Sequence, residues 1–196
     1  MNANTRFDNA LRYREGADEG QVHLTPEYVL APVRAAFGGS IGCDPCTTPE
    51  NPTGAERFYT FADDGLSLPW GDRAFVNPPY GKAREPWVNA CIGEGELLGH
   101  RVILLMPAAT DTRVFQRAAK SADAVVFVKG RLKFGIKRPN GRQRAASHPS
   151  ALFIWGVDAA PFAHLGIVWL SGQQDTPLRS PTMDEWLSVK HAGDDT

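Results

Sequence analysis

The sequence predicts an α/β fold in which helices cover both faces of a mainly parallel sheet. Between residues 41 and 128, short runs rich in Val, Ile and Leu alternate with amphipathic helical segments. After residue 130, strand-like segments follow one another without helices, which indicates antiparallel edge strands at the C-terminal side of the sheet. The chain has 196 residues, 42% of them hydrophobic, so it can bury one core as a single domain.

The expected helices follow from capping residues and from apolar periodicity. The first begins with Thr25 as N-cap and Pro26 as the first helical residue, and its apolar stripe ends at Gly38. The second and third are expected over residues 85–98 and 111–121, where apolar residues recur at helical spacing.

The expected strands are short and mostly apolar. Most are bounded by Gly, Pro or Asp, which end strands or begin turns. Continuous apolar runs, rather than alternating ones, indicate strands that are buried on both faces. The expected strands cover residues 41–43, 57–61, 74–76, 101–106, 124–128, 131–136, 151–155 and 167–170.

The chain divides by composition into three parts. Residues 1–21 are polar and charged with little periodicity, and are expected to form a flexible N-terminal arm. Residues 22–172 form the expected domain, with a basic hairpin inserted near 129–148. Residues 173–196 are polar apart from a few apolar positions, and are expected to form a tail or one closing helix.

Charge and hydropathy limit the partners of the protein. Lys plus Arg is 21 and Asp plus Glu is 22, so a nucleic acid would have to bind at a local basic patch. No apolar run is long enough to span a membrane, and the first twenty residues lack the apolar centre of a signal peptide. We therefore expect a cytoplasmic protein with no membrane partner and no obligate protein partner.

The three cysteines do not predict a metal or redox site. Cys43 and Cys46 have CxxC spacing, but no second CxxC or paired histidines supply the remaining zinc ligands. A redox pair usually opens a helix, and Pro49 and Pro52 disfavour a helix here. No metal is expected, and a CxxC oxidoreductase is left as a remote alternative.

The most informative segment is Asn77-Pro78-Pro79-Tyr80, which directly follows an expected strand. The Asn77 side-chain oxygen and a backbone carbonyl can both accept hydrogen bonds from one planar amino group. The two prolines stiffen the loop and remove competing N–H donors. Tyr80 offers a flat face for stacking. Loops after the strands of open α/β sheets are also the usual place for active sites.

Further short motifs precede this segment in a fixed order. Each is weak alone because such dipeptides recur by chance in turns. Together with the Asn77 segment they are specific. In chain order they are Thr25-Pro26, Asp44-Pro45, Asp64-Gly65-Leu66 with Trp70 downstream, and Asn77-Pro78-Pro79-Tyr80.

In this order the motifs resemble those of nucleic-acid amino-methyltransferases, and among them the small phage-type DNA N6-adenine methyltransferases of the Dam-like family. The resemblance spans roughly residues 22–156 and continues through residues 107–112 and 130–134. It implies a Rossmann-like methyltransferase sheet, S-adenosyl-L-methionine as cofactor, and double-stranded DNA as partner.

The resemblance also implies site residues. Asp44 would line the methionine and ribose side of the cofactor, Asp64 would accept a hydrogen bond from the cofactor's adenine amine, and Leu66 would lie near that ring. The Thr25-Pro26 pair would bracket the methionine end. The implied cofactor-binding residues are Thr25, Pro26, Asp44, Pro45, Asp64, Leu66 and Asn77, and the implied catalytic residues are Asn77, Pro78, Pro79 and Tyr80.

The implied reaction is methyl transfer to N6 of a flipped-out adenine. Hydrogen bonds from N6–H to Asn77 and to the Pro78 carbonyl would favour a nitrogen with an available lone pair. Tyr80 would stack on the flipped base. Phe134 is a candidate for the opposite face of the base, with a core aromatic as the competing interpretation.

DNA contact is expected from the basic stretch after the last predicted helix. A solvated charged hairpin is the competing interpretation. Beside a methyltransferase-like core, the stretch becomes the expected phosphate and groove contact. The implied DNA-binding residues are Arg131, Lys133, Phe134, Lys137, Arg138, Arg142 and Arg144.

One departure from the general methyltransferase pattern is evident. Residues 44–52 contain no glycine where a glycine-rich turn is usual, so no residue is assigned to the cofactor ribose. A non-catalytic DNA-binding module on a degenerate methyltransferase fold therefore stays an alternative. Cytosine N4, RNA and protein glutamine stay alternative acceptors, because each presents a planar amino group.

Overall fold

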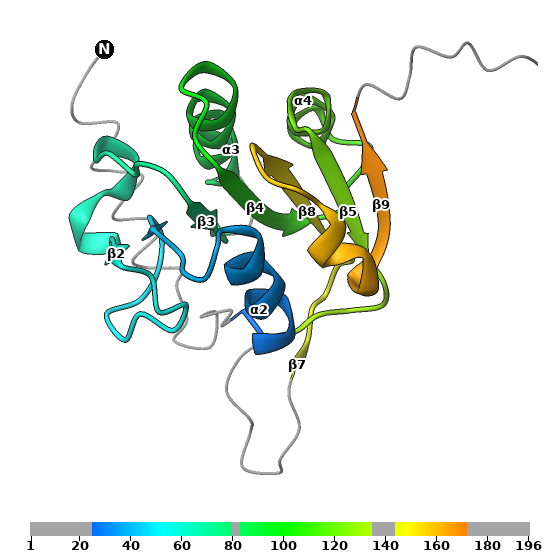
Figure 1. The fold of residues 1–196 in the computed structure, drawn as a ribbon, viewed down its shortest axis with the longest axis horizontal. Helices are drawn as coiled ribbons and strands as arrows, with labels where there is room; N and C mark the ends of the chain where they lie inside the picture. Colours follow the sequence, from blue (N-terminus) through cyan, green and yellow to red (C-terminus); the bar gives the residue numbers. More distant parts are fainter. Residues whose placement is uncertain (1–24, 80–82, 135–143, 172–196) are drawn as a thin grey trace, which may run out of the picture.

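A computed structural model describes residues 25–79, 83–134 and 144–171, which contain a mixed seven-stranded sheet (Figure 1). The strand order is β2-β1-β3-β4-β8-β5-β9. The fold class predicted from the sequence, an α/β protein, is confirmed. The strands are β1 Cys43–Asp44, β2 Arg57–Phe58, β3 Ala74–Val76, β4 Val102–Pro107, β5 Ala124–Val128, β8 Ser150–Trp155 and β9 Gly166–Leu170.

The sheet has a parallel half and an antiparallel half. Strands β2, β1, β3 and β4 run parallel to one another. Strand β8 runs antiparallel to both of its neighbours, β4 and β5, and β9 pairs antiparallel with β5 at the edge. The expected antiparallel strands are therefore present, but only β9 is an edge strand. All six residues of β8 are buried, as expected for a mostly apolar strand in the interior of the sheet.

The strand expected over residues 131–136 does not join the sheet. Strand β6, Lys133–Phe134, instead pairs antiparallel with β7, Arg144–Ala145, in a separate two-stranded ribbon. Residues 135–143, which include the tip of the predicted hairpin, lie outside the described residues.

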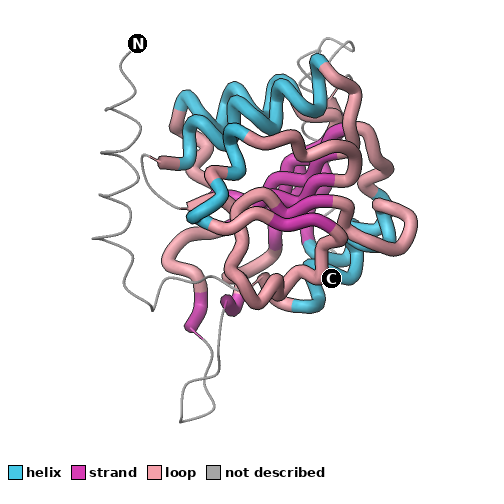
Figure 2. The backbone as a smooth tube through the Cα atoms, turned by 90° about the vertical axis from the view of Figure 1, so that its left-hand side faces the viewer, coloured by secondary structure: helices cyan, strands magenta, loops and turns pink. Residues whose placement is uncertain are grey.

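Helices cover both faces of the sheet, as Figures 1 and 2 show. Helix α2 and the 3₁₀ segment η5 pack on one face, whereas α3 and α4 pack on the other. None of the helices in the described part of the chain is long and apolar enough to cross a membrane. The bounds are α2 Glu27–Ala36, α3 Arg84–Ile92, α4 Arg113–Ser121, the π-helical turn η4 Gly93–Leu97, and the 3₁₀ segments η2 Phe61–Asp63, η3 Gly65–Ser67 and η5 Ala160–Leu165.

Strand β4 shows how one apolar run serves two cores. Successive strand residues point to opposite faces of a sheet, so Ile103 packs with the α2 side and Leu104 with the α3 and α4 side. Val33 of α2 and Phe115 of α4 are members of these two opposite clusters. A continuous run of Val, Ile and Leu is therefore required where a helix covers each face.

Helix α2 begins one residue later than expected. Its N-cap is Pro26, and no side chain caps the helix through a hydrogen bond. The Thr25 hydroxyl instead accepts a hydrogen bond from Asn77 in the loop after β3. Helix α4 does have a side-chain cap, because the Thr112 hydroxyl accepts a hydrogen bond from the Phe115 amide.

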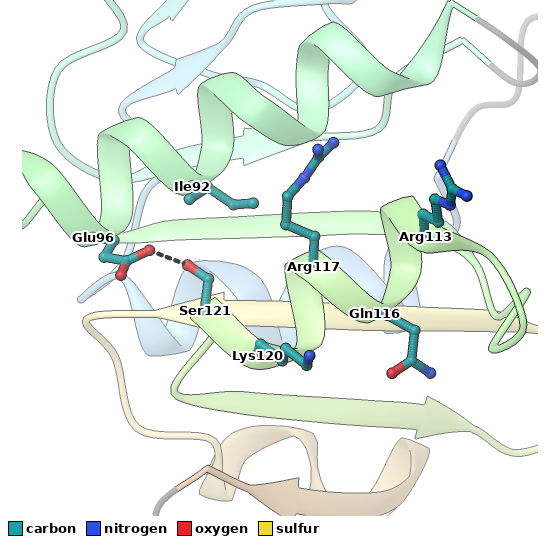
Figure 3. A pocket seen from close by; sticks show the side chains of 7 residues that line it. All are labelled: Ile92, Glu96, Arg113, Gln116, Arg117, Lys120 and Ser121. Carbon is teal, nitrogen blue, oxygen red and sulfur yellow. Dashed lines mark hydrogen bonds between the residues drawn. The ribbon is translucent and has the colours of Figure 1, made fainter.

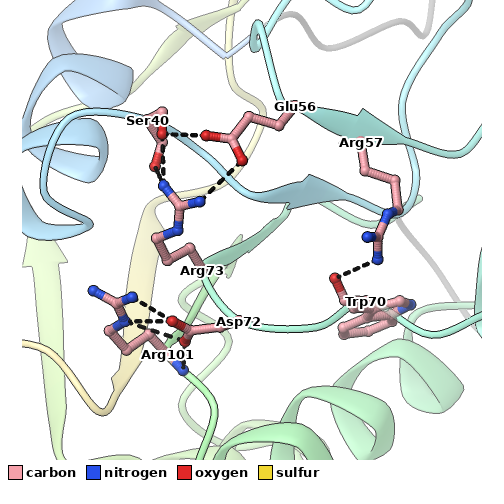
Figure 4. A network of polar contacts seen from close by, with 7 residues as sticks. All are labelled: Ser40, Glu56, Arg57, Trp70, Asp72, Arg73 and Arg101. Carbon is pink, nitrogen blue, oxygen red and sulfur yellow. Dashed lines mark hydrogen bonds and ion pairs between the residues drawn. The ribbon is translucent and has the colours of Figure 1, made fainter.

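The amino ends of the central strands are fixed by charged side chains (Figure 4). Asp72, just before β3, accepts hydrogen bonds from the backbone and guanidinium of Arg101, just before β4. The Arg101 guanidinium holds the pKa of Asp72 well below its usual range. Next to this pair, Arg73 contacts Ser40 and Glu56. The Asp72–Arg101 contacts join β3 to β4, and the Arg73 contacts join β3 to the segments before β1 and β2, at the end opposite the loop that contains Asn77.

The contact between η4 and β8 yields a stability prediction. A Cβ atom at Gly95 would lie 2.5 Å from Cγ of the buried Trp155. We expect Gly95→Ala to lower the free energy of unfolding by about 1–3 kcal/mol, because the core is already filled there. Urea denaturation measures this change.

Gly93→Ala is the matched control for Gly95→Ala. No atom lies within 4 Å of a Cβ at Gly93, and its backbone is right-handed helical. We expect this variant to be as stable as the wild type, or more stable by up to about 1 kcal/mol. Equal destabilisation by the two substitutions would contradict the packing argument.

Candidate active site

The site lies where the carboxyl ends of β1 and β3 meet. The two strands are parallel neighbours, with Cys43 paired to Ala74. Asp44, the last residue of β1, and Asn77, the residue after β3, therefore reach the same edge of the sheet. The expected juxtaposition of these two motifs follows directly from the strand order.

Asn77 is held by two other segments of the chain. Its side-chain Nδ2 donates a hydrogen bond to Thr25 Oγ1 over 3.1 Å. Its backbone hydrogen-bonds the thiol of Cys46, in the loop after β1. Three segments that are far apart in sequence thus meet at Asn77. Pro78 is buried, and Tyr80 lies outside the described residues.

Asp44 is buried beside this junction, with 3% of its surface exposed. Its carboxylate accepts hydrogen bonds from the Thr53 hydroxyl over 2.9 Å and from the Cys46 amide over 3.2 Å. Burial raises the pKa of Asp44 to about 6, and these hydrogen bonds only partly offset that effect. A cation bound next to this carboxylate would lower its pKa and favour its charged form.

Side-chain hydrogen bonds and a later glycine shape the turn after β1: Gly54 has a φ of 67°, and its amide donates to the Asn51 carbonyl over 3.0 Å. Asn51 adopts a positive φ of 45°. Its side chain accepts from the amide of Ala55 over 3.1 Å and donates to the carbonyl of Ala55 over 3.0 Å. The Thr53 hydroxyl connects this turn to Asp44. Sequence reasoning missed Asn51 and Thr53, although Asn is a residue that tolerates positive φ and closes turns with its side chain.

The Asp64 motif packs directly on the Asp44 motif. A Cβ atom at Gly65 would lie 2.0 Å from the carbonyl oxygen of Pro45, so only glycine fits at this position. Asp64, with φ of 52°, accepts a hydrogen bond from the Ser67 hydroxyl over 2.6 Å. The structure therefore brings Asp64 to the turn that follows β1.

Trp70 stabilises the contact between Gly65 and Pro45. Its Nε1 donates to the carbonyl of Gly65 over 2.7 Å, and its ring stacks on Trp87 of α3 at a centroid distance of 6.0 Å. Leu66 is 37% exposed, which is a high value for a leucine. An apolar side chain thus lies at the surface two residues after Asp64 in the chain.

Comparison with known proteins identifies the family. The family model described as DNA N-6-adenine-methyltransferase (Dam) matches residues 16–176. This chain belongs to the Dam family. A protein named DNA N-6-adenine-methyltransferase from Haemophilus phage HP1 (strain HP1c1) is 24% identical over 149 residues, which cover 75% of this chain and 84% of that protein. The resemblance inferred from the motifs is confirmed.

The predicted DNA-binding residues of this Dam family member have different surroundings. Lys133 is exposed, whereas Arg131 donates to the backbone carbonyls of Ala146 and Ser147. Phe134 is 3% exposed and packs in the core on the α2 side, which agrees with its interpretation as a core aromatic. The backbone of Arg144 pairs with Phe134, and Lys137, Arg138 and Arg142 lie outside the described residues.

A groove of about 570 Å³ lies between the end of α3 and α4 (Figure 3). Within it Ser121 donates to Glu96 over 2.8 Å, and Arg117 forms an ion pair with Glu85 over 3.1 Å. None of the groove residues is a predicted site residue of this Dam family member. The groove is lined by Ile92, Glu96, Arg113, Gln116, Arg117, Lys120 and Ser121.

The cysteines of this Dam family member are kept as thiols. Burial raises the pKa of Cys43 to about 12 and raises the pKa values of Cys46 and Cys91 well above the ordinary range. Reactive cysteines require the opposite shift. Across the described ranges, no group of three His, Cys, Asp or Glu side chains could hold a metal ion.

The raised pKa of Asp44 makes stability depend on pH. The folded pKa of about 6 lies above the ordinary pKa of an aspartate, 3.8. The folded state thus favours the protonated acid, whose stabilising contribution is full below pH 3.8 and is lost as the pH rises through 6. We expect Asp44→Asn to raise the free energy of unfolding of the ligand-free protein by on the order of 3 kcal/mol at neutral pH.

Urea denaturation at pH 7.5 (about 1.5 units above the folded pKa) and near pH 4 tests this expectation. The stabilisation by Asp44→Asn should shrink to a small fraction near pH 4, where the wild-type carboxyl is protonated. The exposed Asp111 offers a matched control, Asp111→Asn, which should change stability little at either pH. A gain from Asp44→Asn that is the same at both pH values would show that burial of the charge is not its cause.

Proposed function

We propose that this protein transfers a methyl group from S-adenosyl-L-methionine to the exocyclic N6 of an adenine in double-stranded DNA. The observation that supports this most strongly is the fixed position of Asn77 at the carboxyl end of the sheet, bound by Thr25 and Cys46. Membership of the Dam family supplies the reaction class. The relative from Haemophilus phage HP1 carries the same activity in its name.

The acceptor nitrogen needs hydrogen-bond acceptors rather than a strong base. Its lone pair is conjugated with the purine ring, so N6 is a poor nucleophile. The Asn77 side-chain oxygen and the Pro78 carbonyl each accept a hydrogen bond from one of the two N6–H groups. These hydrogen bonds favour a form of N6 whose lone pair is available. Positioning in line with the methyl group then supplies most of the rate enhancement. The prolines hold both acceptors in a stiff loop.

The target base reaches this loop only outside the duplex. We propose that the adenine is flipped out of the DNA helix and that Tyr80 stacks on it, as enzymes that act on bases require. Lys133 and Arg131, with Lys137, Arg138, Arg142 and Arg144, then bind the DNA phosphates and grooves. The formal net charge of −1 makes such a local basic region necessary for DNA binding.

The residues around Asn77 fit the proposed cofactor. S-adenosyl-L-methionine carries a cationic sulfonium, which supplies an electrophilic methyl group. The buried Asp44 carboxylate, whose pKa is raised to about 6 by burial, gains from a cation nearby. Asp64 and the exposed Leu66 offer an acceptor and an apolar contact to the adenosine end, and Thr25 with Pro26 lies at the methionine end.

We expect the protein to act in the cytoplasm, which would be the host cytoplasm if a phage carries the gene. The turn from Asn51 to Gly54 weakens the interpretation as a degenerate, non-catalytic module, because its hydrogen bonds give the loop after β1 a defined structure. Calorimetric titration with S-adenosyl-L-methionine distinguishes the two: dissociation constants in about the micromolar range support an enzyme.

Replacement of Asn77 tests the proposed acceptor contact. We expect Asn77→Ala to lower kcat for transfer of labelled methyl groups to DNA by about a hundredfold or more, because a positioned hydrogen-bond partner is removed. The matched control is Asn89→Ala, on the exposed side of α3, which should leave kcat unchanged. Methyl transfer by Asn77→Ala at the wild-type rate would contradict the proposal.

The identity of the acceptor requires a separate experiment. The wild-type protein is incubated with labelled cofactor and with duplex DNA, RNA or protein in parallel, and the methylated product is identified by mass spectrometry. We expect N6-methyladenine in DNA. N4-methylcytosine, or label in RNA or in protein glutamine, would assign the same chemistry to another amino group.

A further inference from the structure

The contact between Thr25 and Asn77 joins residues that are 52 positions apart in the chain. Thr25 directly precedes the N-cap of helix α2, which is anchored in the core by the fully buried Val29 and Val33. Its hydroxyl is not used to cap that helix. Instead it accepts a hydrogen bond from Nδ2 of Asn77 over 3.1 Å. In the structure the rigid start of α2 thus contacts the nitrogen end of the Asn77 amide.

The two ends of an asparagine amide have nearly the same shape and opposite chemistry. The oxygen accepts hydrogen bonds and the nitrogen donates them. Rotation of the amide by 180° would direct an N–H group at the N6–H of the acceptor, and the required hydrogen bond could not form. The Cys46 thiol and the prolines hold the backbone of Asn77, but a backbone contact does not distinguish the two ends of the side chain.

We propose that Thr25 is a positioning residue that orients the Asn77 amide with its oxygen toward the acceptor amine. The inference rests on the proposed function, and it adds a role for Thr25 that differs from contact with the cofactor. The two roles use different parts of one hydroxyl. A hydroxyl can accept from Nδ2 or donate to Oδ1, so it selects the nitrogen end of the amide once its own hydrogen is donated to another group, as contact with the cofactor would require. A lone pair of Oγ1 then accepts from Asn77.

Two substitutions at Thr25 separate orientation from shape. Thr25→Val keeps the shape of the side chain and removes the hydroxyl, whereas Thr25→Ser keeps the hydroxyl. We expect Thr25→Val to lower kcat by roughly ten- to a hundredfold, because misorientation of a reacting group is costly. Thr25→Ser should stay within a few-fold of wild type. Equal losses in both variants, or no loss in Thr25→Val, would overturn the proposal.

Cofactor affinity is measured for the same variants by calorimetry. The proposal expects the main loss in kcat, with a smaller change in the dissociation constant for S-adenosyl-L-methionine. A loss that lies entirely in cofactor affinity would assign Thr25 to cofactor binding alone. Wild-type activity is measured first, so that an absence of adenine methylation would count against the proposed function rather than against the role of Thr25.

An Asn77→Asp background gives the sharpest activity test. A carboxylate has two acceptor oxygens, so it has no wrong orientation. We expect the loss caused by Thr25→Val to be much smaller in the Asn77→Asp variant than in the wild type. The same fold loss in both backgrounds would show that Thr25 acts on something other than amide orientation. If the Asn77→Asp variant is inactive, the comparison of Thr25→Val with Thr25→Ser decides.

An NMR measurement tests the contact without any activity. The side-chain amide hydrogens of Asn77 are assigned in ¹⁵N-labelled protein, and their exchange with solvent is followed. We expect one protected amide hydrogen in wild type and in Thr25→Ser, and loss of that protection in Thr25→Val. Unchanged protection in Thr25→Val would overturn the proposal even if the acceptor of the methyl group proved to be different.

Discussion

The parallel pairing of β1 with β3 is the constraint on which the site depends. It brings Asp44 and Asn77 to one edge of the sheet, although they lie far apart in the sequence. All other contacts of the site are built on this pair. The turn after β1 carries Cys46 to the backbone of Asn77, and the tight approach of Gly65 to Pro45 carries Asp64 to the same turn. At the opposite end of this strand pair, Arg73, just before β3, donates to the Ser40 hydroxyl, in the segment before β1.

The elements that the sequence predicted well are those with strong local signals. The strands Ala74–Val76 and Ala124–Val128 are found with the expected bounds, because their apolar runs are closed by clear breaks. The order of the motifs was enough to indicate the family. The predicted start of α2 was wrong by one residue, because threonine is a common N-cap residue. The Thr25 hydroxyl instead accepts a hydrogen bond from Asn77, which is distant in the sequence.

What the sequence could not show depends on contacts between distant segments. The position of β8 between β4 and β5 is a property of the whole sheet, and a local pattern gives only its burial. The turn after β1 is held by side-chain hydrogen bonds of Asn51 and Thr53, and its left-handed glycine, Gly54, comes later in the loop than the usual glycine-rich turn. The burial of Phe134 is decided by packing against the α2 side, which its place in a basic stretch does not reveal.

The interior position of β8 has a consequence for how the chain folds. In the described part of the chain, strands β4 and β5 are not neighbours, and β8, residues 150–155, lies between them and pairs with both. During synthesis, β4 and β5 are complete well before β8 leaves the ribosome, so each presents an unpaired apolar edge in the meantime. The pairing of β8 with both is therefore a late, long-range step, and η5 and β9, which follow β8 in the chain, complete the core and the sheet after it.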